Sequence, residues 1–494
     1  MSTALLSQAA ASRPRSGASS CAGCSGTPRP RTGPSPASRR CGSLSSAGRA
    51  RSLCPCPRLL GRSRRGPRLR PSAGTCPSSP GQRPLGPGKA GSVSSVASLL
   101  SLEEAIAAVL ERARPLEAER VRVESSRGRV LAEDATARVD LPPFPSSAMD
   151  GYAVRVADLP GRLPVIFHIA AGRPAPCALG PREAMAIATG GVVPEGADAV
   201  VPLELAQAEG EWVELPAVQP GSNIRWQGGD VARGKVVVPA GVRLGPAQIG
   251  ALAAAGVSDV WCRRRPRVAV VTTGTELRPP GEPLRLGEVY EANGVMLASQ
   301  IEAAGGVVER LTPVADDEQA HRQAIEWGLS QDVLVTSGGV SMGPHDLVRG
   351  VEAELGVEEV FWGVAVKPGK PVSFATRDST LVFGLPGNPV SALVGCELFV
   401  RPALLALQGA IDPGPPLEPG ILGQSVARDP RRDQLARARR RVEKDRILLF
   451  PVSGQDSHMI VRAAEADALV LVPRGEGELS AGEVARYLRL DCAG

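Results

Sequence analysis

Residues 332–346, DVLVTSGGVSMGPHD, are the stretch that decides the fold. The apolar run at 333–335 is rich in β-branched residues and predicts a buried strand that ends before Thr336. The small residues after it let backbone amides approach an anion closely, and they are Thr336, Ser337, Gly338, Gly339 and Ser341. Pro344 and the apolar period after it predict a helix. Strand, glycine-rich loop and helix in this order suit a phosphate-bearing ligand, although a tight turn with glycines for packing is an equal alternative.

Strand and helix signals alternate over residues 266–409, which is typical of a mostly parallel, doubly wound α/β sheet. Strands are predicted at 268–272, 307–311 and 381–385, and helices at 294–304 and up to 329, the second capped by Asp317 or its neighbour. The loops after the strands carry Glu276, Asp316, Asp346, Lys367, Lys370 and Ser391. Because the carboxyl ends of parallel strands meet at one edge, we expect these side chains to lie together.

Carboxylates beside lysines suit a phosphorylated ligand held through Mg²⁺, although each residue alone could be a cap or a surface charge. Two nucleotide-binding fingerprints are absent from the sequence, G-x-G-x-x-G and G-x-x-x-x-G-K-[ST]. The expected site is therefore neither a dinucleotide fold nor a P-loop.

The net charge of +6 conceals two regimes. Sixteen Arg and Lys residues and no Asp or Glu lie in residues 1–100, which leaves a net charge of −10 for the rest of the chain. Excess basic charge favours nucleic acid, but here it is confined to the tail, so no nucleic-acid partner is expected for the folded part. Six of the ten cysteines lie in the tail without zinc-site spacing, and the others are far apart, which favours a reducing compartment over a disulfide scaffold. No apolar run approaches the roughly 18–20 residues that span a bilayer, so no membrane partner is expected.

Residues 1–97 are rich in Ser, Pro, Gly and Arg and show neither a helical nor a strand period, which predicts a disordered tail. Three interpretations remain: an organelle transit peptide, a basic arm that contacts nucleic acid nonspecifically, or upstream DNA translated from a start assigned too early. We favour the third. The expected location is cytoplasmic, with organelle targeting as the alternative.

The ordered chain is predicted to begin with a helix, because SLEE at 101–104 is a capping box before an apolar face. We interpret residues 98–141 and 224–265 as a linker platform and residues 142–223 as an inserted small β-domain. Asp150 follows a proline-rich loop, Thr189 opens a glycine-rich segment, and Asp230 lies at a glycine-rich bend. Each is either a turn residue or a side chain that reaches into a cleft.

Residues 410–494 begin with a proline-rich linker and are predicted to form a small C-terminal β-barrel domain with strands at 438–442, 447–451 and 468–472. Arg437 belongs to a group of arginines that either form a solvated face or close a cleft over an anion. Ser457 lies in a polar turn.

Seven segments together resemble one known family, and they occur in the family's order. They are PFPSSAMDGYA at 143–153, TGGVVPEGADAVV at 189–201, NIR at 223–225, TGTEL at 273–277, TSGGVSMG at 336–343 with Asp346, VKPGKP at 366–371 and LPGNPVS at 385–391. On these segments the chain resembles the molybdopterin molybdenumtransferases: bacterial MoeA, the plant Cnx E domain and the E domain of gephyrin. The resemblance covers about residues 100–494 and implies a central MogA-like α/β domain.

The resemblance implies a transferase that inserts molybdate into adenylylated molybdopterin with release of AMP and with Mg²⁺ as cofactor. It also implies a homodimer in which the partner's Asp150-bearing domain completes the cleft. As catalytic acids it implies Asp316, Asp346, Glu276, Asp230 and Asp150, of which Asp316 and Asp346 would hold the metal. As contacts for substrate it implies Thr189, the small residues at 336–341, Lys367, Lys370, Ser391, Arg437 and Ser457.

Three positions depart from the family pattern. Thr275 and Gly229 stand where the family often has an acid, and Glu291 replaces the aspartate of an Asp-x-Asn segment. We still expect an active enzyme, because the other acids remain. The alternatives are a molybdopterin adenylyltransferase activity and a non-catalytic scaffold, and contacts with the adenylyltransferase and with molybdoenzyme chaperones are compatible with the resemblance.

Overall fold

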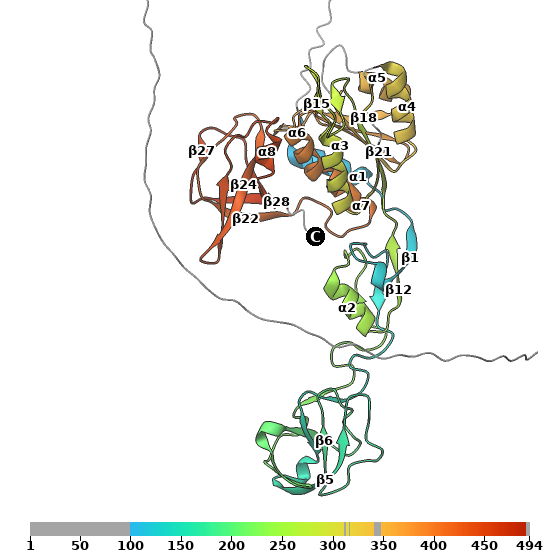
Figure 1. The fold of residues 1–494 in the computed structure, drawn as a ribbon, viewed down its shortest axis with the longest axis vertical. Coiled ribbons are helices and arrows are strands. Elements are labelled where there is room, and N and C mark those ends of the chain that lie inside the picture. Colours follow the sequence, from blue (N-terminus) through green and yellow to red (C-terminus); the bar gives the residue numbers. More distant parts are fainter. Residues whose placement is uncertain (1–98, 311–312, 316, 340–346, 491–494) are drawn as a thin grey trace, which may run out of the picture. The chain divides into compact units, whose positions relative to one another are not determined.

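The computed structural model describes residues 99–310, 313–315, 317–339 and 347–490. Residues 266–409 form a six-stranded sheet with the order β16-β13-β17-β21-β20-β18. Two of its strands, β18 and β21, are labelled in Figure 1. Its parallel strands are β13 (Arg267–Thr272), β16 (Val307–Arg310), β17 (Val333–Ser337) and β21 (Thr380–Leu385). The antiparallel strands are β20 (Ser373–Arg377) and β18 (Glu358–Trp362). The predicted α/β class is confirmed.

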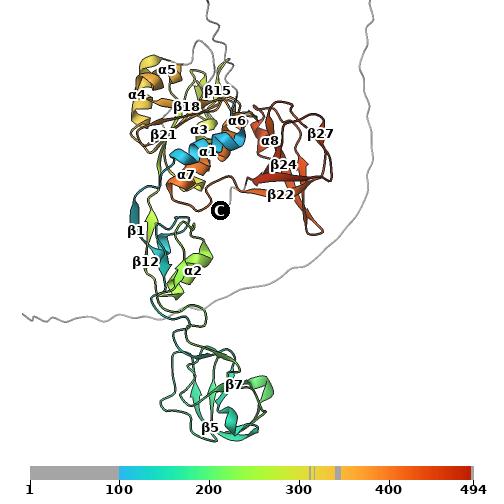
Figure 2. The same cartoon turned by 180° about the vertical axis from the view of Figure 1, so that it is seen from behind.

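Helices cover both faces of this sheet (Figures 1 and 2). On one face lie α4 (Glu318–Gly328) and α5 (Leu347–Glu354), which pack on Val271 and Leu334. On the other lie α3 (Asn293–Ala303), α6 (Pro389–Gly395) and α7 (Arg401–Leu407), which pack on Val270 and Val335. This division follows from the alternation of side chains along each strand. Asp317 caps α4 as predicted, accepting a hydrogen bond from the backbone N–H of Ala320.

Strand β17 is longer than the sequence predicted. It continues through Thr336 and Ser337, which pair with Gly384 and Leu385 of β21 on one side and with β13 on the other. The prediction that the strand ends before Thr336 was wrong, because two parallel neighbours supply ladder hydrogen bonds to small polar residues that have little strand preference alone.

One helical run is long and apolar enough to cross a membrane by length and composition, contrary to the sequence prediction. It is Pro389–Leu407, with 19 residues and a mean hydropathy of 1.8, and it comprises α6, a π-helical turn (Cys396–Val400) and α7. However, 83% of its apolar window is buried inside the fold. A helix that is apolar all round and buried is typical of the core of an α/β domain.

Helix α1 (Leu102–Arg112) begins with the predicted capping box at Ser101 and Glu104. Its buried residues Leu102, Ala105 and Val109 belong to the same hydrophobic cluster as α7 and the central sheet. The sequence placed this helix with the linker platform, but its apolar face packs in the α/β core, because that is where complementary apolar surface lies.

The chain between α1 and β13 first forms small paired elements. Strand β1 (Ala118–Arg122) pairs with β12 (Asp259–Arg263), and β2 (Ala135–Thr136) pairs with β11 (Val236–Val238). The 3₁₀ turn Val123–Ser125 and helix α2 (Pro246–Ala254) pack with them around Leu131 and Leu252.

A six-stranded sheet with the order β7-β4-β6-β5-β9-β8 is inserted between β3 (Ser146–Ser147) and β10 (Ile224–Arg225), which pair with each other. Its strands are β4 (Gly151–Val154), β5 (Gly161–Ile169), β6 (Ala184–Ile187), β7 (Ala199–Pro202), β8 (Gln207–Glu209) and β9 (Trp212–Leu215). Two 3₁₀ turns join them, Val156–Asp158 and Leu203–Leu205. The strands therefore return the chain close to where it left, which places Asp150 and Thr189 in loops of one small unit.

The C-terminal strands close into the predicted barrel. Its five strands are β22 (Leu417–Leu422), β24 (Asp433–Glu443), β25 (Arg446–Pro451), β26 (Ala468–Val472) and β28 (Val484–Arg489), paired in the cycle β24-β25-β22-β28-β26-β24. Smaller elements are α8 (Ile460–Ala463) and the pair of β23 (Val426–Ala427) with β27 (Glu478–Leu479). Strand β19 (Val366–Lys367) pairs in parallel with the start of β24. This pairing joins the segment that bears Lys367 to the barrel.

Candidate active site

The carboxyl ends of β17 and β21 are joined by one asparagine. Asn293, the first residue of α3, donates from Nδ2 to Ser337 Oγ at 2.9 Å and to the carbonyl oxygen of Gly387 at 2.8 Å. Ser337 ends β17 and Gly387 follows β21, so Asn293 holds two strand ends and a helix start together. The ends of β17 and β21 therefore meet at one edge of the sheet, while the convergence of the predicted charged side chains stays a prediction.

Thr336 and Ser337 do not present free hydroxyls at this edge. Their side chains are 0% and 2% exposed, and they donate to the carbonyl oxygens of Phe383 and Pro386 at 3.4 and 3.3 Å. These two side chains brace the strand ends, because the strand continues through them. The predicted contact of this segment with substrate, which concerned its backbone amides, stays a prediction. Ser341, predicted with them, lies outside the described residues.

Gly338 and Gly339 form the turn that leaves β17. Their φ angles are +99° and +65°, in the left-handed region that favours glycine. A Cβ atom at Gly338 would lie 2.7 Å from Thr273 Oγ1 and 2.9 Å from its carbonyl oxygen. The close approach of β13 and β17 at this edge therefore requires glycine. The Gly338 N–H donates to the carbonyl oxygen of Leu385 at 3.1 Å, so the turn is also fixed to the end of β21.

The predicted acids of this edge divide into described and undescribed residues. Glu276 is exposed, and its carboxylate oxygens lie over Gly274, where a Cβ would be 2.7 Å from one of them. Asp316 and Asp346 lie outside the described residues. After Asp316 in the chain, Asp317 caps α4. Before it, Val314 forms a parallel bridge with Thr273, just beyond the end of β13. Among the residues described, no group of three His, Cys, Asp or Glu side chains could hold a metal ion.

Glu291 replaces the aspartate that the family resemblance leads one to expect, and the structure shows what it does. Its side chain is 6% exposed and accepts a hydrogen bond from the N–H of Gly294 at 2.5 Å. Acceptance of a first-turn N–H stabilises the start of a helix. Glu291 thus supports α3, the helix that presents Asn293.

Three segments meet on the basic side of the site. The backbone N–H of Val390, in the first turn of α6, donates to the carbonyl oxygen of Ser457 at 3.0 Å. A Cβ atom at Gly369 would lie 3.8 Å from the carbonyl oxygen of Ser391, which places the 367–370 turn against the same helix start. The structure thus brings together the segments that carry Lys367, Lys370, Ser391 and Ser457. Both lysines are exposed, whereas Ser391 is buried.

Asp429, which the sequence did not single out, holds Lys367. Its Oδ2 lies 3.7 Å from Lys367 Nζ and 3.0 Å from Arg432 Nη2. Its Oδ1 accepts the backbone N–H groups of Arg431 and Arg432 at 3.0 and 3.1 Å. These hydrogen bonds, the one from the Arg431 N–H first, lower the pKa of Asp429 below its usual value. A fixed carboxylate therefore separates two cations.

Arg437 is not an exposed anion contact. Its side chain is 1% exposed, and it donates to the carbonyl oxygens of Met459 at 2.9 Å, Gly454 at 2.8 Å and Asp456 at 3.2 Å. Gln455 completes the network by donating from Nε2 to the Arg437 carbonyl oxygen at 2.9 Å. The prediction of direct contact is corrected: Arg437 organises the loop that carries Ser457. Burial lowers the pKa of this guanidinium from its ordinary value.

Asp150 and Thr189 are paired, as their loops are adjacent in the inserted sheet. Asp150 Oδ1 accepts the backbone N–H of Thr189 at 2.6 Å and its hydroxyl at 2.9 Å. The backbone hydrogen bond, and then the hydroxyl, lower the pKa of Asp150 from its usual value. Both residues are exposed, so this carboxylate stays ionised and open to solvent.

Asp230 lines a cavity of about 460 Å³ with Leu141, Pro142, Arg225, Trp226 and Gly229. The loop 226–230 is fixed to the preceding segment, because Gly228 N–H donates to the Pro142 carbonyl at 2.9 Å and Asp230 N–H to that of Leu141 at 2.9 Å. Asp140 holds the outer side of this loop by accepting from Gln227 Nε2 at 2.7 Å and from the N–H of Arg233 at 2.8 Å.

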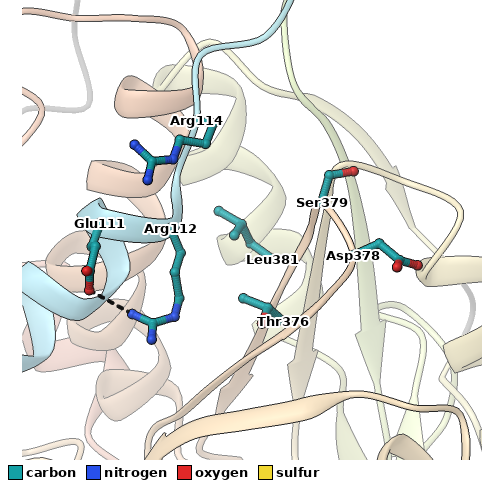
Figure 3. A pocket seen from close by; sticks show the side chains of 7 residues that line it. All are labelled: Glu111, Arg112, Arg114, Thr376, Asp378, Ser379 and Leu381. Atoms are coloured by element: carbon teal, nitrogen blue, oxygen red, sulfur yellow. Dashed lines mark hydrogen bonds and ion pairs between the residues drawn. The ribbon is translucent and has the colours of Figure 1, made fainter.

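A second cavity, of about 350 Å³, lies at the opposite end of β20 and β21 (Figure 3). Its lining residues are Glu111, Arg112, Arg114, Thr376, Asp378, Ser379 and Leu381. Arg112 is paired with Glu111 at 3.1 Å. None of the predicted site residues lines this cavity, so it is separate from the candidate site.

Comparison with known proteins agrees with this arrangement along the whole described chain. The model of the MoeA N-terminal region (domain I and II) matches residues 100–256, that of a probable molybdopterin binding domain matches 269–406, and that of the MoeA C-terminal region (domain IV) matches 419–490. Molybdopterin molybdenumtransferase 2 of Mycobacterium tuberculosis (strain H37Rv) is 36% identical over 397 residues, which are 77% of this chain and 96% of that protein. The chain belongs to the molybdopterin molybdenumtransferase family.

Other members of the family match over the same extent. The molybdopterin molybdenumtransferase of Haemophilus influenzae is 34% identical over 78% of this chain and 97% of its own. A crystal structure of the molybdopterin biosynthesis MoeA protein from Pyrococcus horikoshii aligns with a TM-score of 0.65 and 33% identity, covering 80% of this chain and all of that one. The fold of this family member is therefore shared over nearly the full length of its relatives.

Sequence reasoning missed Asn293, Asp429 and Trp226 as site residues. Asn293 could have been found, because a polar residue that opens a helix after a strand lies at the edge of a parallel sheet. Asp429 begins a D-P-R-R turn, and such a turn gives no sign of a distant lysine. Trp226 lies in a loop without periodicity, so only the structure shows that it lines a cavity.

Proposed function

We propose that this chain is a molybdopterin molybdenumtransferase that uses molybdate and adenylylated molybdopterin and releases AMP. Water cleaves the phosphoanhydride to give AMP and the pterin phosphate. The dithiolene sulfurs replace one oxo group of molybdate, which leaves as water with the two thiol protons. The family match and the names of the relatives support the assignment.

The observation that carries this proposal is the meeting of the 367–370 turn, the start of α6 and the loop of Ser457. Molybdate is a small dianion, and lysines, hydroxyls and helix N-termini are the groups that hold such an ion. Lys367 and Lys370 are exposed there, and Arg437 holds the loop of Ser457 by donating to the carbonyl oxygen of Gly454. We infer that molybdate binds on this side of the site.

We infer that the adenylate phosphates lie at the strand-end side, near Gly338, Gly339 and Glu276. Asp316 and Asp346 are the residues that would hold Mg²⁺, since carboxylate oxygens are its preferred protein ligands. Mg²⁺, when bound, neutralises charge that develops on the phosphates. The chain's own part is to orient the phosphates on backbone N–H groups.

We further propose that the enzyme acts as a homodimer in which Asp150 and Asp230 of one copy serve the site of the other. Their exposure supports this, since neither carboxylate is covered by the described part of its own chain. Mixing Asp346→Asn and Asp150→Asn proteins tests it. If sites are shared, half of the dimers in an equal mixture are mixed and each of these has one intact site, so turnover recovers to about a quarter of the wild-type value. A mixture that stays as inactive as the two variants contradicts sharing.

The function is tested by incubating the protein with adenylylated molybdopterin, molybdate and Mg²⁺ and following AMP release. We expect release that depends on molybdate and Mg²⁺ and is lost in Asp346→Asn. Unchanged turnover in that variant would refute its role. In a parallel reaction with molybdopterin, ATP and Mg²⁺, formation of adenylylated pterin would overturn the assignment in favour of adenylylation.

A further inference from the structure

The cavity at Asp230 has the composition of a site for a flat ligand. It is a hollow of about 460 Å³ that is open to solvent, and an indole, a leucine and a proline form part of its wall. Trp226 is 55% exposed. An indole that is left open to solvent on a wall of a cavity offers its face for stacking.

The loop that carries Trp226 is held in place before any ligand arrives. Gly228 and Asp230 donate backbone hydrogen bonds to Pro142 and Leu141, and Gly229 N–H donates to the Trp226 carbonyl at 3.1 Å. The indole lies against the turn at Gly221, where a Cβ would be 3.7 Å from Trp226 Cζ2. Because backbone and ring are both supported, little conformational entropy remains to be lost on binding.

Two opposite charges line the same cavity. Within the part of the chain that the structure describes, neither the Arg225 guanidinium nor the Asp230 carboxylate makes a side-chain hydrogen bond or ion pair. An exposed carboxylate accepts hydrogen bonds from ring N–H and amino groups, and a guanidinium binds phosphate or carboxylate. One cavity therefore offers an aromatic face for a flat ring, a carboxylate for hydrogen-bond donors and a guanidinium for an anion.

We propose that this cavity binds the planar nitrogen heterocycle of the adenylylated pterin, with the ring stacked on Trp226, its N–H groups on Asp230 and an attached anion on Arg225. This rests on the proposed function and adds a specificity-determining residue to it. Adenine and the pterin ring share this chemistry, and both belong to the same substrate.

Calorimetric titration of the full chain with AMP and, separately, with 6-carboxypterin distinguishes the two rings. Stacking of a base on an aromatic side chain contributes strongly to binding and tolerates different bases. We therefore expect Trp226→Ala to raise the Kd of one probe about tenfold and to leave the other within about twofold. Trp226→Phe, which keeps an aromatic face, should stay within about threefold of wild type.

Trp212 provides a matched control. It is 45% exposed in the inserted sheet, and the Arg162 guanidinium already lies 5.7 Å from its ring centre. Trp212→Ala should bind both probes as the wild type does. If Trp226→Ala and Trp212→Ala give the same Kd values as the wild type, the proposal is overturned. Failure of the proposed function has a different signature, which is absence of AMP release in the wild type whatever the probes do.

Discussion

The cations near Lys367 and the two carboxylates Asp150 and Asp230 are held in place by different means. On the basic side, Arg437 is buried beneath the loop of Ser457, and Asp429 is fixed between Lys367 and Arg432. On the acidic side, Asp150 and Asp230 stand on exposed loops that backbone hydrogen bonds support. A buried charge is costly to disturb, whereas an exposed one is not. The basic side is thus part of the folded framework, and the acidic side can adjust to what it meets.

The largest effect in this comparison is expected from Arg437→Met. The change leaves the partly buried carbonyl oxygens of Gly454, Asp456 and Met459 without their donor. An unsatisfied buried acceptor costs about 1–3 kcal/mol, so we expect a loss of roughly 2–4 kcal/mol in the free energy of unfolding. Denaturant unfolding measures the loss.

Arg437→Lys separates bracing from charge. Lysine keeps the charge but lacks the planar set of donors, so it should recover little of the stability and little molybdate-dependent turnover. Arg437→Met with native stability and an unchanged molybdate KM would show that the guanidinium does not organise this loop.

Asn293→Ala should have the next largest effect. It removes the hydrogen bonds to Ser337 and Gly387 that join two strand ends, which is worth about 1–2 kcal/mol in stability, and it should also lower kcat/KM for AMP release. Gln300→Ala is the control on the same helix, because Gln300 Nε2 donates to Leu393 and Glu397 at 3.2 and 2.7 Å, away from the edge. Equal kinetic defects in the two variants would contradict a role for Asn293 at the site.

A smaller effect is expected from Asp429→Asn, which tests whether Lys367 is positioned or merely neutralised. Lys367 is 48% exposed, so loss of the contact should raise the molybdate KM only about two- to fivefold, with kcat nearly unchanged. Asp433→Asn removes a nearby acid whose carboxylate accepts the N–H of Arg474 and, among the described residues, makes no ion pair with Lys367. If only the loss of one negative charge near the site mattered, both variants would attract molybdate more strongly and would lower its KM by the same factor.

Local signals in the sequence predicted the framework, and tertiary contacts explain what they missed. The capping box at Ser101, the cap at Asp317 and the strand at 268–272 depend on neighbouring residues, so they could be predicted. The burial of Arg437 depends on a loop some twenty residues away along the chain, and the extension of β17 depends on two partner strands. The apolar run at 389–407 was underestimated because polar residues such as Glu397 interrupt it in sequence.

The smallest effect concerns Asp150, where the acidic side can be tuned without loss of the fold. Hydrogen bonds hold the folded-state pKa of Asp150 below the value of about 3.9 for a free aspartate, so their stabilisation is present above that pH and is lost as the pH falls through the lowered pKa. Thr189→Ala removes only the hydroxyl, while the stronger backbone N–H remains. We therefore expect the pKa of Asp150, measured from its carboxyl carbon by NMR, to rise part of the way to the free value. Thr189→Ser should restore it. A full return to the free value in Thr189→Ala would mean that the hydroxyl, not the loop backbone, sets the charge, and the acidic side would then depend on side chains as the basic side does.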